Sequence, residues 1–253
     1  MACASVIDNI NTHTESNSDE ELPEPTEQTI GLPKGGKEWE VELYVKQTQE
    51  HWPTYGNHIL AQFDDDSIVV YQAYEPMIAQ FAVDNQRFGG PYFSYSRMSW
   101  IKTNFLWMMY RSGWGAKKNQ TRILAVRISR SGFEEILASA YTAKLQKSRN
   151  ITTDKINVRL QWDPDHGPNY NKLSRRAIQL GLKGEILQKY GSEWIVSITD
   201  ITKFVRQQRK VLDTEGVGQL MTARERVYPV SNTAVSQRIQ LDFQELATVV
   251  GFT

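Results

Sequence analysis

The chain has 253 residues, of which 40% are hydrophobic, and this length suits one large domain or two small ones. Its single cysteine, Cys3, excludes a disulfide framework and a zinc site built from thiolates. No apolar run approaches the roughly 18 residues of a membrane-spanning helix, and the acidic N-terminus is unlike a targeting peptide. These features favour a protein of the cytoplasm, with no membrane partner.

The net charge of +0 is unevenly distributed along the chain. Residues 1–33 contain seven acidic residues and no Lys or Arg, so the remaining 220 residues carry 29 basic and 22 acidic side chains, a balance of +7. We expect residues 1–36 to be a disordered acidic tail, because they lack the apolar surface to offset an ordering entropy of roughly 1–2 kcal/mol per residue. A basic body suits an anionic ligand such as a nucleotide or a nucleic acid.

Residues 37–253 are predicted to form a single globular α+β domain with a mixed, largely antiparallel sheet flanked by helices. In chain order the predicted elements are an alternating segment at 39–43, strands at 58–63 and 67–74, a helix opened by Glu75 and Pro76, a strand at 92–96, a helix from Ser96 or Ser99 to about Ser112, a strand at 122–129, a helix at 131–139, strands at 156–163 and 194–198, and a helix at 201–212. The helix opened by Glu75 and Pro76 is expected to bury Ile78, Phe81 and Ala82. The pattern of residues 177–184 fits either a strand or a helix, and its two glycines favour a strand. Residues 214–253 either wrap the domain or are partly loose.

The segment 91–115 is dense in aromatic and basic side chains. Its apolar residues recur at three- and four-residue spacing, which predicts one buried helical face. The members of that face are Trp100, Ile101, Asn104, Phe105, Met108 and Met109. Arg97, Lys102 and Arg111 are then the wet or ligand-facing positions of the helix.

Several turns and helix ends have local signatures. Ser131 with Glu134 is typical of a capping box, and residues 163–168 are rich in turn formers and predict a rigid loop. Asp200 is expected to cap the helix at 201–212, which continues into a basic run. The acidic turn at 64–66 resembles a cation loop, but a solvated hairpin turn needs no metal. The histidines lack metal-ligand spacing, so we expect no metal site.

Polar side chains gather where predicted strands end. Gln72 and Tyr74 close one strand, and Ser94 and Ser96 close another with Arg97 following. A third strand ends in Gln161 and Asp163. Strand ends beside helix starts offer backbone N–H groups and hydroxyls to a phosphate-bearing ligand, although each residue alone would also suit an ordinary turn.

Three long runs carry a resemblance to a known family. The runs WPTYGNHILAQFDDDSIVVYQAY, FSYSRMSWIKTNFLWMMYRSGWG and VRLQWDPDHGP resemble the domain of unknown function 4291, found in fungi and bacteria. The resemblance covers roughly residues 37–212. The family name implies no activity.

A weaker resemblance, to the ADP-ribosyltransferase superfamily, implies a fold and an activity. That superfamily places a strand ending in Tyr-Arg and another ending in Ser-Thr-Ser before helices, and a later strand bears a catalytic Glu. Tyr71-Gln72 and Ser94-Tyr95-Ser96 are similar to the first two elements, with Gln72 in place of Arg and Tyr95 in place of Thr. The catalytic position is left between Gln161 and Glu185, with Glu193 a further alternative.

These resemblances imply an ADP-ribosyltransferase-like domain that binds NAD or a related nucleotide and would transfer ADP-ribose if a carboxylate is in place. Ser94 and Ser96 would contact the nicotinamide ribose, Tyr74 or Trp100 would stack on a ring, and Arg97 or Lys102 would meet the pyrophosphate. The full set of expected ligand-binding residues is His58, Gln72, Tyr74, Ser94, Ser96, Arg97, Trp100, Lys102 and Asp163. The alternative is a non-catalytic module that binds nucleic acid through its basic body and the run of Arg206, Arg209 and Lys210.

Overall fold

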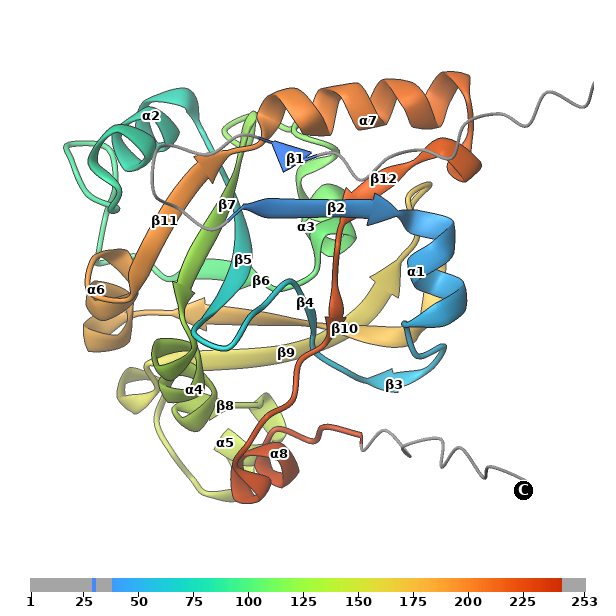
Figure 1. The fold of residues 1–253 in the computed structure, drawn as a ribbon. Helices are drawn as coiled ribbons and strands as arrows, with labels where there is room; N and C mark the ends of the chain where they lie inside the picture. The colour runs from blue at the N-terminus through green and yellow to red at the C-terminus, as the bar shows by residue number, and fades with distance from the viewer. Residues whose placement is uncertain (1–28, 31–37, 243–253) are drawn as a thin grey trace, which may run out of the picture.

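A computed structural model of the protein describes residues 29–30 and 38–242 (Figure 1). Its strands are β1 (Thr29–Ile30), β2 (Trp39–Leu43), β3 (Gly56–Asn57), β4 (Leu60–Ala61), β5 (Ser67–Tyr74), β6 (Ser99–Lys102), β7 (Arg122–Ser129), β8 (Ala140–Tyr141), β9 (Val158–His166), β10 (Lys172–Leu182), β11 (Ile195–Asp200), β12 (Met221–Ala223) and β13 (Arg226–Val227). Its α-helices are α1 (Tyr44–Glu50), α2 (Pro76–Asn85), α3 (Phe105–Ser112), α4 (Arg130–Ala138), α5 (Ala143–Ser148), α6 (Gly184–Gly191), α7 (Thr202–Thr214) and α8 (Thr233–Arg238). The predicted α+β class is confirmed.

The main sheet has eight strands in the order β11-β7-β5-β6-β10-β9-β8, with β3 pairing β10. It is mixed but largely antiparallel, as predicted, since the parallel pairs are β3 with β10 and β8 with β9. Its centre is the eight-residue ladder between β5 and β7. Both strands were predicted with these bounds, because their nearly continuous apolar runs are typical of strands buried on both faces.

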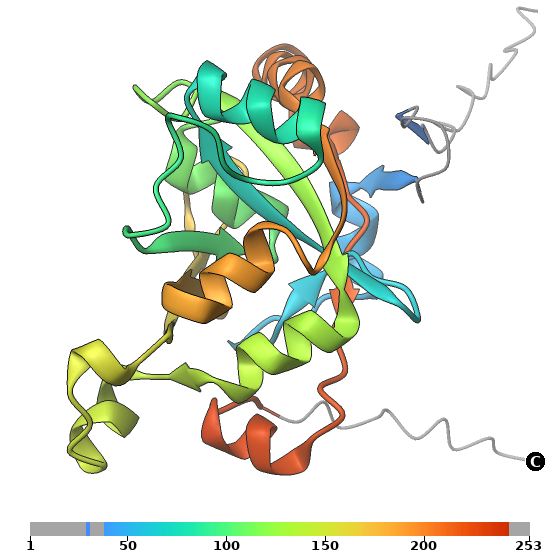
Figure 2. The same ribbon diagram turned by 90° about the vertical axis from the view of Figure 1, so that its left-hand side faces the viewer.

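Alternate residues of the central strands enter two different cores. On β5, Ile68 and Val70 join a core with α2, α4 and α6, whereas Val69 and Tyr71 join a core with β2, α3 and α7. Because successive side chains of a strand point to opposite faces, the two cores lie on the two faces of the sheet. The helices α2, α4 and α6 cover the face that Figure 2 turns toward the viewer.

The aromatic segment 91–115 folds differently from its prediction. Residues 99–102 are strand β6, paired with β10 over four residues, and helix α3 begins only at Phe105. Asn104 is the N-cap, and its Oδ1 accepts a 2.7 Å hydrogen bond from the Trp107 N–H. The predicted strand at 92–96 is absent among these described residues, which form turns instead. Helical spacing was misleading here because an Asn cap interrupts the run and the edge of β10 recruits the residues before it.

Three other boundaries are corrected by the structure. Ser129, not Ser131, caps α4, because its Oγ accepts the Gly132 N–H at 3.2 Å. The predicted loop at 163–168 begins as part of β9, which continues to His166. The strand predicted at 58–63 is reduced to the two residues of β4.

Helix α2 begins at Pro76 as predicted, but its buried residues are Ala79 and Ala82, while Ile78 and Phe81 are half-buried. Small side chains allow this helix to approach the sheet closely.

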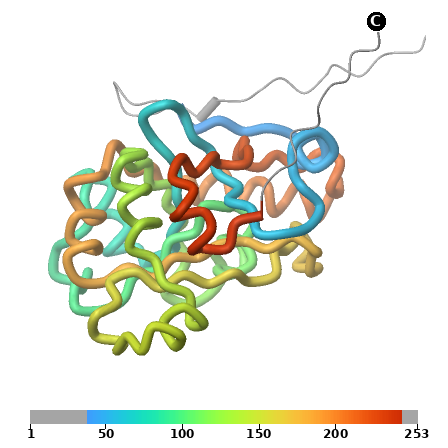
Figure 3. Tube along the Cα trace, turned by 90° about the horizontal axis from the view of Figure 1, so that it is seen from below, coloured from blue at the N-terminus to red at the C-terminus, as the bar shows by residue number. Residues whose placement is uncertain are grey.

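The two ends of the described chain pack on the domain. Strand β1 pairs with β2 through Ile30 and Trp39, and its two residues fall within the segment 1–36 that was predicted to be a disordered tail. Residues 1–28 and 31–36 of that predicted tail lie outside the described residues. The C-terminal segment with α8 crosses the underside of the molecule (Figure 3), where the Arg238 guanidinium donates to the Leu137 carbonyl at 2.9 Å. Within the described residues, no helix combines the length and apolar character needed to cross a bilayer.

Candidate functional site

The sheet opens between β5 and β6. These antiparallel strands share one register pair, Tyr71 with Lys102, although continued pairing would bring Gln72 opposite Ile101 and Tyr74 opposite Ser99. The strands diverge after the first pair. β5 keeps its full ladder with β7, and β6 keeps its ladder with β10, so each half of the sheet is intact on either side of the opening.

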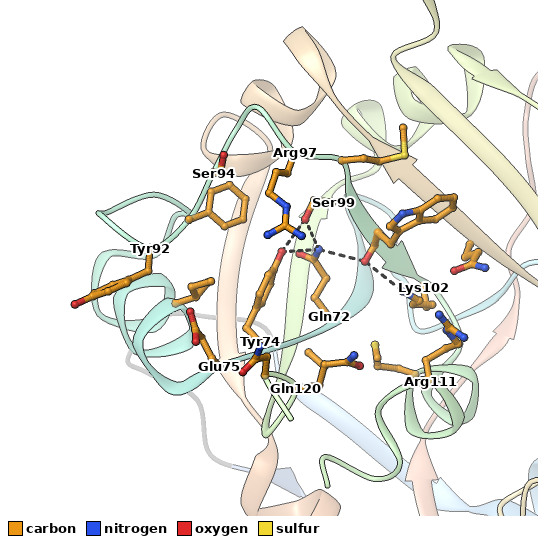
Figure 4. A pocket seen from close by; sticks show the side chains of 18 of the residues that line it. Gln72, Tyr74, Glu75, Tyr92, Ser94, Arg97, Ser99, Lys102, Arg111 and Gln120 are labelled. Atoms are coloured by element: carbon orange, nitrogen blue, oxygen red, sulfur yellow. Dashed lines mark hydrogen bonds between the residues drawn. The ribbon is translucent and has the colours of Figure 1, made fainter. Parts of the chain in front are cut away.

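The side chain of Gln72 bridges this opening in place of backbone pairing (Figure 4). Its Nε2 donates to Tyr74 Oη at 2.9 Å, to Ser99 Oγ at 3.1 Å and to the Trp100 carbonyl at 3.2 Å. Its Oε1 accepts a 2.7 Å bond from the Tyr190 hydroxyl. Tyr74 Oη and Ser99 Oγ lie 2.7 Å apart, and burial raises the pKa of Tyr74. The network is neutral and holds both edges of the opening at a fixed spacing.

A cavity of about 650 Å³ lies in this opening, within the range of small-molecule sites. It is lined by Gln72, Ala73, Tyr74, Glu75, Ile78, Tyr92, Phe93, Ser94, Arg97, Met98, Ser99, Trp100, Lys102, Met108, Arg111, Asn119, Gln120, Gln161 and Gln179. Its walls combine aromatic rings, amides and basic side chains. Trp100 is fixed there by close packing on Gly181, where a Cβ would lie 3.0 Å from the indole.

One wall of the cavity is a row of polar side chains across three strands. Lys102 on β6 is in register with Gln179 on β10, which is in register with Gln161 on β9. Register partners on adjacent strands point to the same face, so the three side chains lie side by side. Gln179 Nε2 donates to Gln161 Oε1 at 2.9 Å and to Asp163 Oδ2 at 2.6 Å. The amides of Gln179 and Gln161 therefore lie in one row with Lys102 on the same face of the sheet.

The charge of the cavity is positive. Arg97, Lys102 and Arg111 line it, and Glu75 is the one acidic residue among the described lining residues. Arg97 and Arg111 are exposed, and in the part of the chain that the structure describes neither makes a salt bridge. Basic groups that converge on a cavity without acidic partners favour an anionic ligand.

The family described as "Domain of unknown function (DUF4291)" matches residues 58–228, about two thirds of the sequence. The chain belongs to this family. The matched region contains β5, β6, β9 and β10, so the opening and its cavity lie within the family domain. A search of curated proteins found no match.

Most residues expected to bind a ligand line the cavity. These are Gln72, Tyr74, Ser94, Arg97, Trp100, Lys102 and, from the catalytic pair, Gln161. Asp163 is held at its edge through Gln179. Ser96 is exposed and pairs with Ser94 at 2.8 Å without lining the cavity.

Two expected site residues lie elsewhere. Glu185, which was predicted as the catalytic carboxylate, is exposed in the first turn of α6 and does not line the cavity. His58 is buried outside the cavity, in the field of Asp242.

Sequence reasoning missed several lining residues, notably Glu75, Ser99 and Gln179. Gln179 carried a usable signal, because a Gln inside the apolar run of β10 is unusual for a buried strand. Ser99 was assigned to a helix cap and could not be placed without strand β6. Among the described residues, no group of three or more His, Cys, Asp or Glu side chains is arranged to hold a metal.

Lys102, which was predicted to be a wet or ligand-facing position, is buried while it lines the cavity. It is 7% exposed, not a wet position, and its Nζ has one hydrogen bond, to the Trp100 carbonyl at 3.4 Å. Burial, with the nearby charge of Arg111, lowers the pKa of Lys102 to about 7, and the weaker field of Asp163 opposes this shift. A buried amine of this kind is about half protonated at neutral pH.

This pKa predicts how stability depends on pH. A lysine whose pKa is lower in the folded than in the unfolded state holds fewer protons when folded, so stability rises with pH between about 7 and the unfolded value of about 10.4. We expect Lys102→Met to remove this contribution, up to about 1.4 kcal/mol per pH unit. Urea unfolding of the wild type and of Lys102→Met at pH 7 and pH 9 measures how the unfolding free energy of each protein changes with pH. Parallel pH dependence in the two proteins would contradict the buried-amine assignment.

Proposed function

We propose that the cavity between β5 and β6 binds NAD or a related nucleotide. The observation that carries the proposal is the convergence of Arg97, Lys102 and Arg111, unpaired with acids among the described residues, on a cavity with aromatic and amide walls. The basic groups suit a pyrophosphate, and Tyr92, Phe93 and Trp100 offer apolar surface to a ring.

The position of the cavity supports an ADP-ribosyltransferase-like arrangement. The resemblance implies that Gln72 stands where an Arg would hold the NAD phosphate and that Ser94 contacts the nicotinamide ribose, and both residues line the cavity. Gln72 stands where the superfamily has an Arg, and it is engaged in the bridging network. Arg97 and Arg111, from neighbouring elements, would supply the charge that Gln72 lacks.

Transfer of ADP-ribose would need a group that stabilises positive charge on the ribose as the nicotinamide bond breaks. Glu185 does not line the cavity, and Gln161 is neutral. Glu75, at the N-cap of α2 with no side-chain cap bond, is the lining carboxylate available for this role. If transfer occurs, we expect Glu75→Gln to abolish it while leaving NAD binding nearly unchanged. The cytoplasm, where NAD is available and a single cysteine stays reduced, is the proposed location.

Calorimetry with NAD and ADP-ribose tests the binding proposal. We expect Arg111→Gln to weaken binding about tenfold or more, because a charge-assisted contact to phosphate is worth about 1.5–3 kcal/mol. The matched control is Arg206→Gln, because Arg206 is exposed on α7 outside the cavity. This variant should bind both ligands with the affinity of the wild type. Absence of heat with millimolar ligand, or equal weakening by both substitutions, would overturn the proposal.

The exposed basic side chains of helix α7 support the alternative hypothesis that the protein binds nucleic acid. Lys203, Arg206 and Lys210 lie on its exposed side at three- and four-residue spacing, while Arg209 is paired with Asp213. Binding by this surface predicts affinity for RNA or DNA that falls steeply with salt and is weakened by Arg206→Gln but not by Arg111→Gln. Binding that is flat with salt, or absent, would remove this alternative.

A further inference from the structure

Lys102 has an environment suited to a reactive amine. Its side chain ends in the cavity (Figure 4), and no carboxylate among the described residues lies within ion-pair distance of it. The charges that face it are Arg111 from α3 and the weaker influence of Asp163 from β9. A lysine that is desolvated beside another cation is the arrangement that makes an amine nucleophilic near neutral pH.

Lys102 also differs from the other described lysines. Lys102 is the buried lysine among the described residues. Lys118, which precedes the lining residue Asn119 in the sequence, is exposed, and Lys189 is paired with Glu135 at 2.7 Å. Its pKa of about 7 leaves about half of the amine neutral at pH 7, against on the order of one in a thousand for an exposed lysine. Because a larger fraction of the Lys102 amine is neutral, with a free nitrogen lone pair, we expect electrophiles to react with Lys102 in preference to the exposed lysines.

The same cavity can hold an anion next to this amine. Arg111 lines it beside Lys102, and Arg97 lines its opposite edge. A ligand anchored by these guanidinium groups would present its remaining atoms to Nζ, at the high effective concentration that positioning provides.

We propose that Lys102 forms an imine with an anionic carbonyl compound, that is, an aldehyde carrying a phosphate held by Arg111 or a longer pyrophosphate that also reaches Arg97. The inference rests on the proposed function in that both place an anion in this cavity. ADP-ribose, whose terminal ribose opens to an aldehyde, belongs to this chemical class.

The step is balanced within the protein and its ligand. The lone pair of the neutral Nζ attacks the carbonyl carbon, a C–N bond forms, and the carbonyl π electrons move to oxygen, which takes up a proton as the amine loses one. The resulting carbinolamine loses its hydroxyl with the second amine hydrogen as water, and the nitrogen lone pair completes the C=N bond. Gln161, in the polar row with Lys102, would donate a hydrogen bond from its Nε2 to the departing oxygen, while its Oε1 accepts from Gln179.

Reductive trapping with glycolaldehyde phosphate and cyanoborohydride at pH 7 tests the inference, with the modified lysine mapped by peptide mass spectrometry. We expect Lys102 of the wild type to be labelled about tenfold or more faster than Lys118, given the difference in neutral fraction. Arg111→Gln should slow the labelling by glycolaldehyde phosphate more than the labelling by uncharged glycolaldehyde, because the uncharged aldehyde responds only to the higher Lys102 pKa that loss of the Arg111 charge produces. Lys118→Arg is the matched control and should leave the rate at Lys102 unchanged.

The mapping on the wild type does not depend on any variant folding. Labelling of Lys102 no faster than of Lys118, or equal rates with the charged and uncharged aldehydes in both the wild type and Arg111→Gln, would overturn the inference. Calorimetry separates it from the nucleotide proposal. Binding of NAD and ADP-ribose without trapping at Lys102 would refute the imine alone, and trapping of glycolaldehyde phosphate without nucleotide binding would refute the nucleotide alone.

Discussion

Phe105→Ala is expected to destabilise the protein by about 3–5 kcal/mol, the range for truncation of a fully buried aromatic residue. Phe105 is 0% exposed at the start of α3. Its ring centroid lies 5.7 Å from that of Tyr71 and 6.1 Å from those of Trp39, Trp114 and Phe204. The substitution would leave a void among four aromatic rings that cannot all move into it.

Chemical unfolding monitored by tryptophan fluorescence and circular dichroism measures this cost. Phe105→Leu is the control, because it keeps much of the volume and should lose considerably less stability. If Phe105→Ala lost less than about 1 kcal/mol of unfolding free energy, the core formed by β2, α3 and α7 would be packed far more loosely than the ring geometry indicates.

Glu225→Ala is expected to cost at least about 2 kcal/mol, because it leaves two buried donors without acceptors at about 1–3 kcal/mol each. Glu225 is 0% exposed, and its carboxylate accepts the Phe105 N–H at 2.6 Å and the Asn104 Nδ2 at 2.9 Å. It thereby completes the N-terminus of α3 from a segment 120 residues further along the chain. Burial raises the pKa of Glu225, and the hydrogen bond from the Phe105 N–H opposes the shift.

The matched control for this carboxylate is Glu185→Ala, an exposed acidic residue in the first turn of α6. Its unfolding free energy should change by no more than about 0.5 kcal/mol. Urea melts of the two variants give the comparison. Equal melting of Glu225→Ala and the wild type would show that Glu225 does not secure α3.

The parts of the fold that were predictable depend on local pattern. The runs of β5 and β7 are apolar enough to be recognised as central strands, and Pro76 marks the start of α2. Strand β6 was not predictable in this way. Its four residues continue smoothly into the helical spacing of α3, and what makes them a strand is the edge of β10, 77 positions later at the Lys102–Gln179 pair.

The same distinction applies to the site. Polar residues at strand ends located one side of the cavity at Gln72 and Tyr74, because such residues are exceptions in an apolar run. The burial of Lys102 follows from its register with Tyr71 and Gln179, which no local pattern contains. Glu185 was chosen because it is a carboxylate close in sequence to the predicted third strand, and it lies in the first turn of α6, outside the cavity lining.

A crystal structure with ADP-ribose tests the central claim most directly, since that claim is a nucleotide-binding cavity where β5 and β6 separate. We predict density for the pyrophosphate within hydrogen-bond distance of the Arg97 and Arg111 guanidinium groups, with the Gln72 network intact behind it. An empty cavity at saturating ligand, or a nucleotide bound on the exposed side of α7 instead, would contradict it.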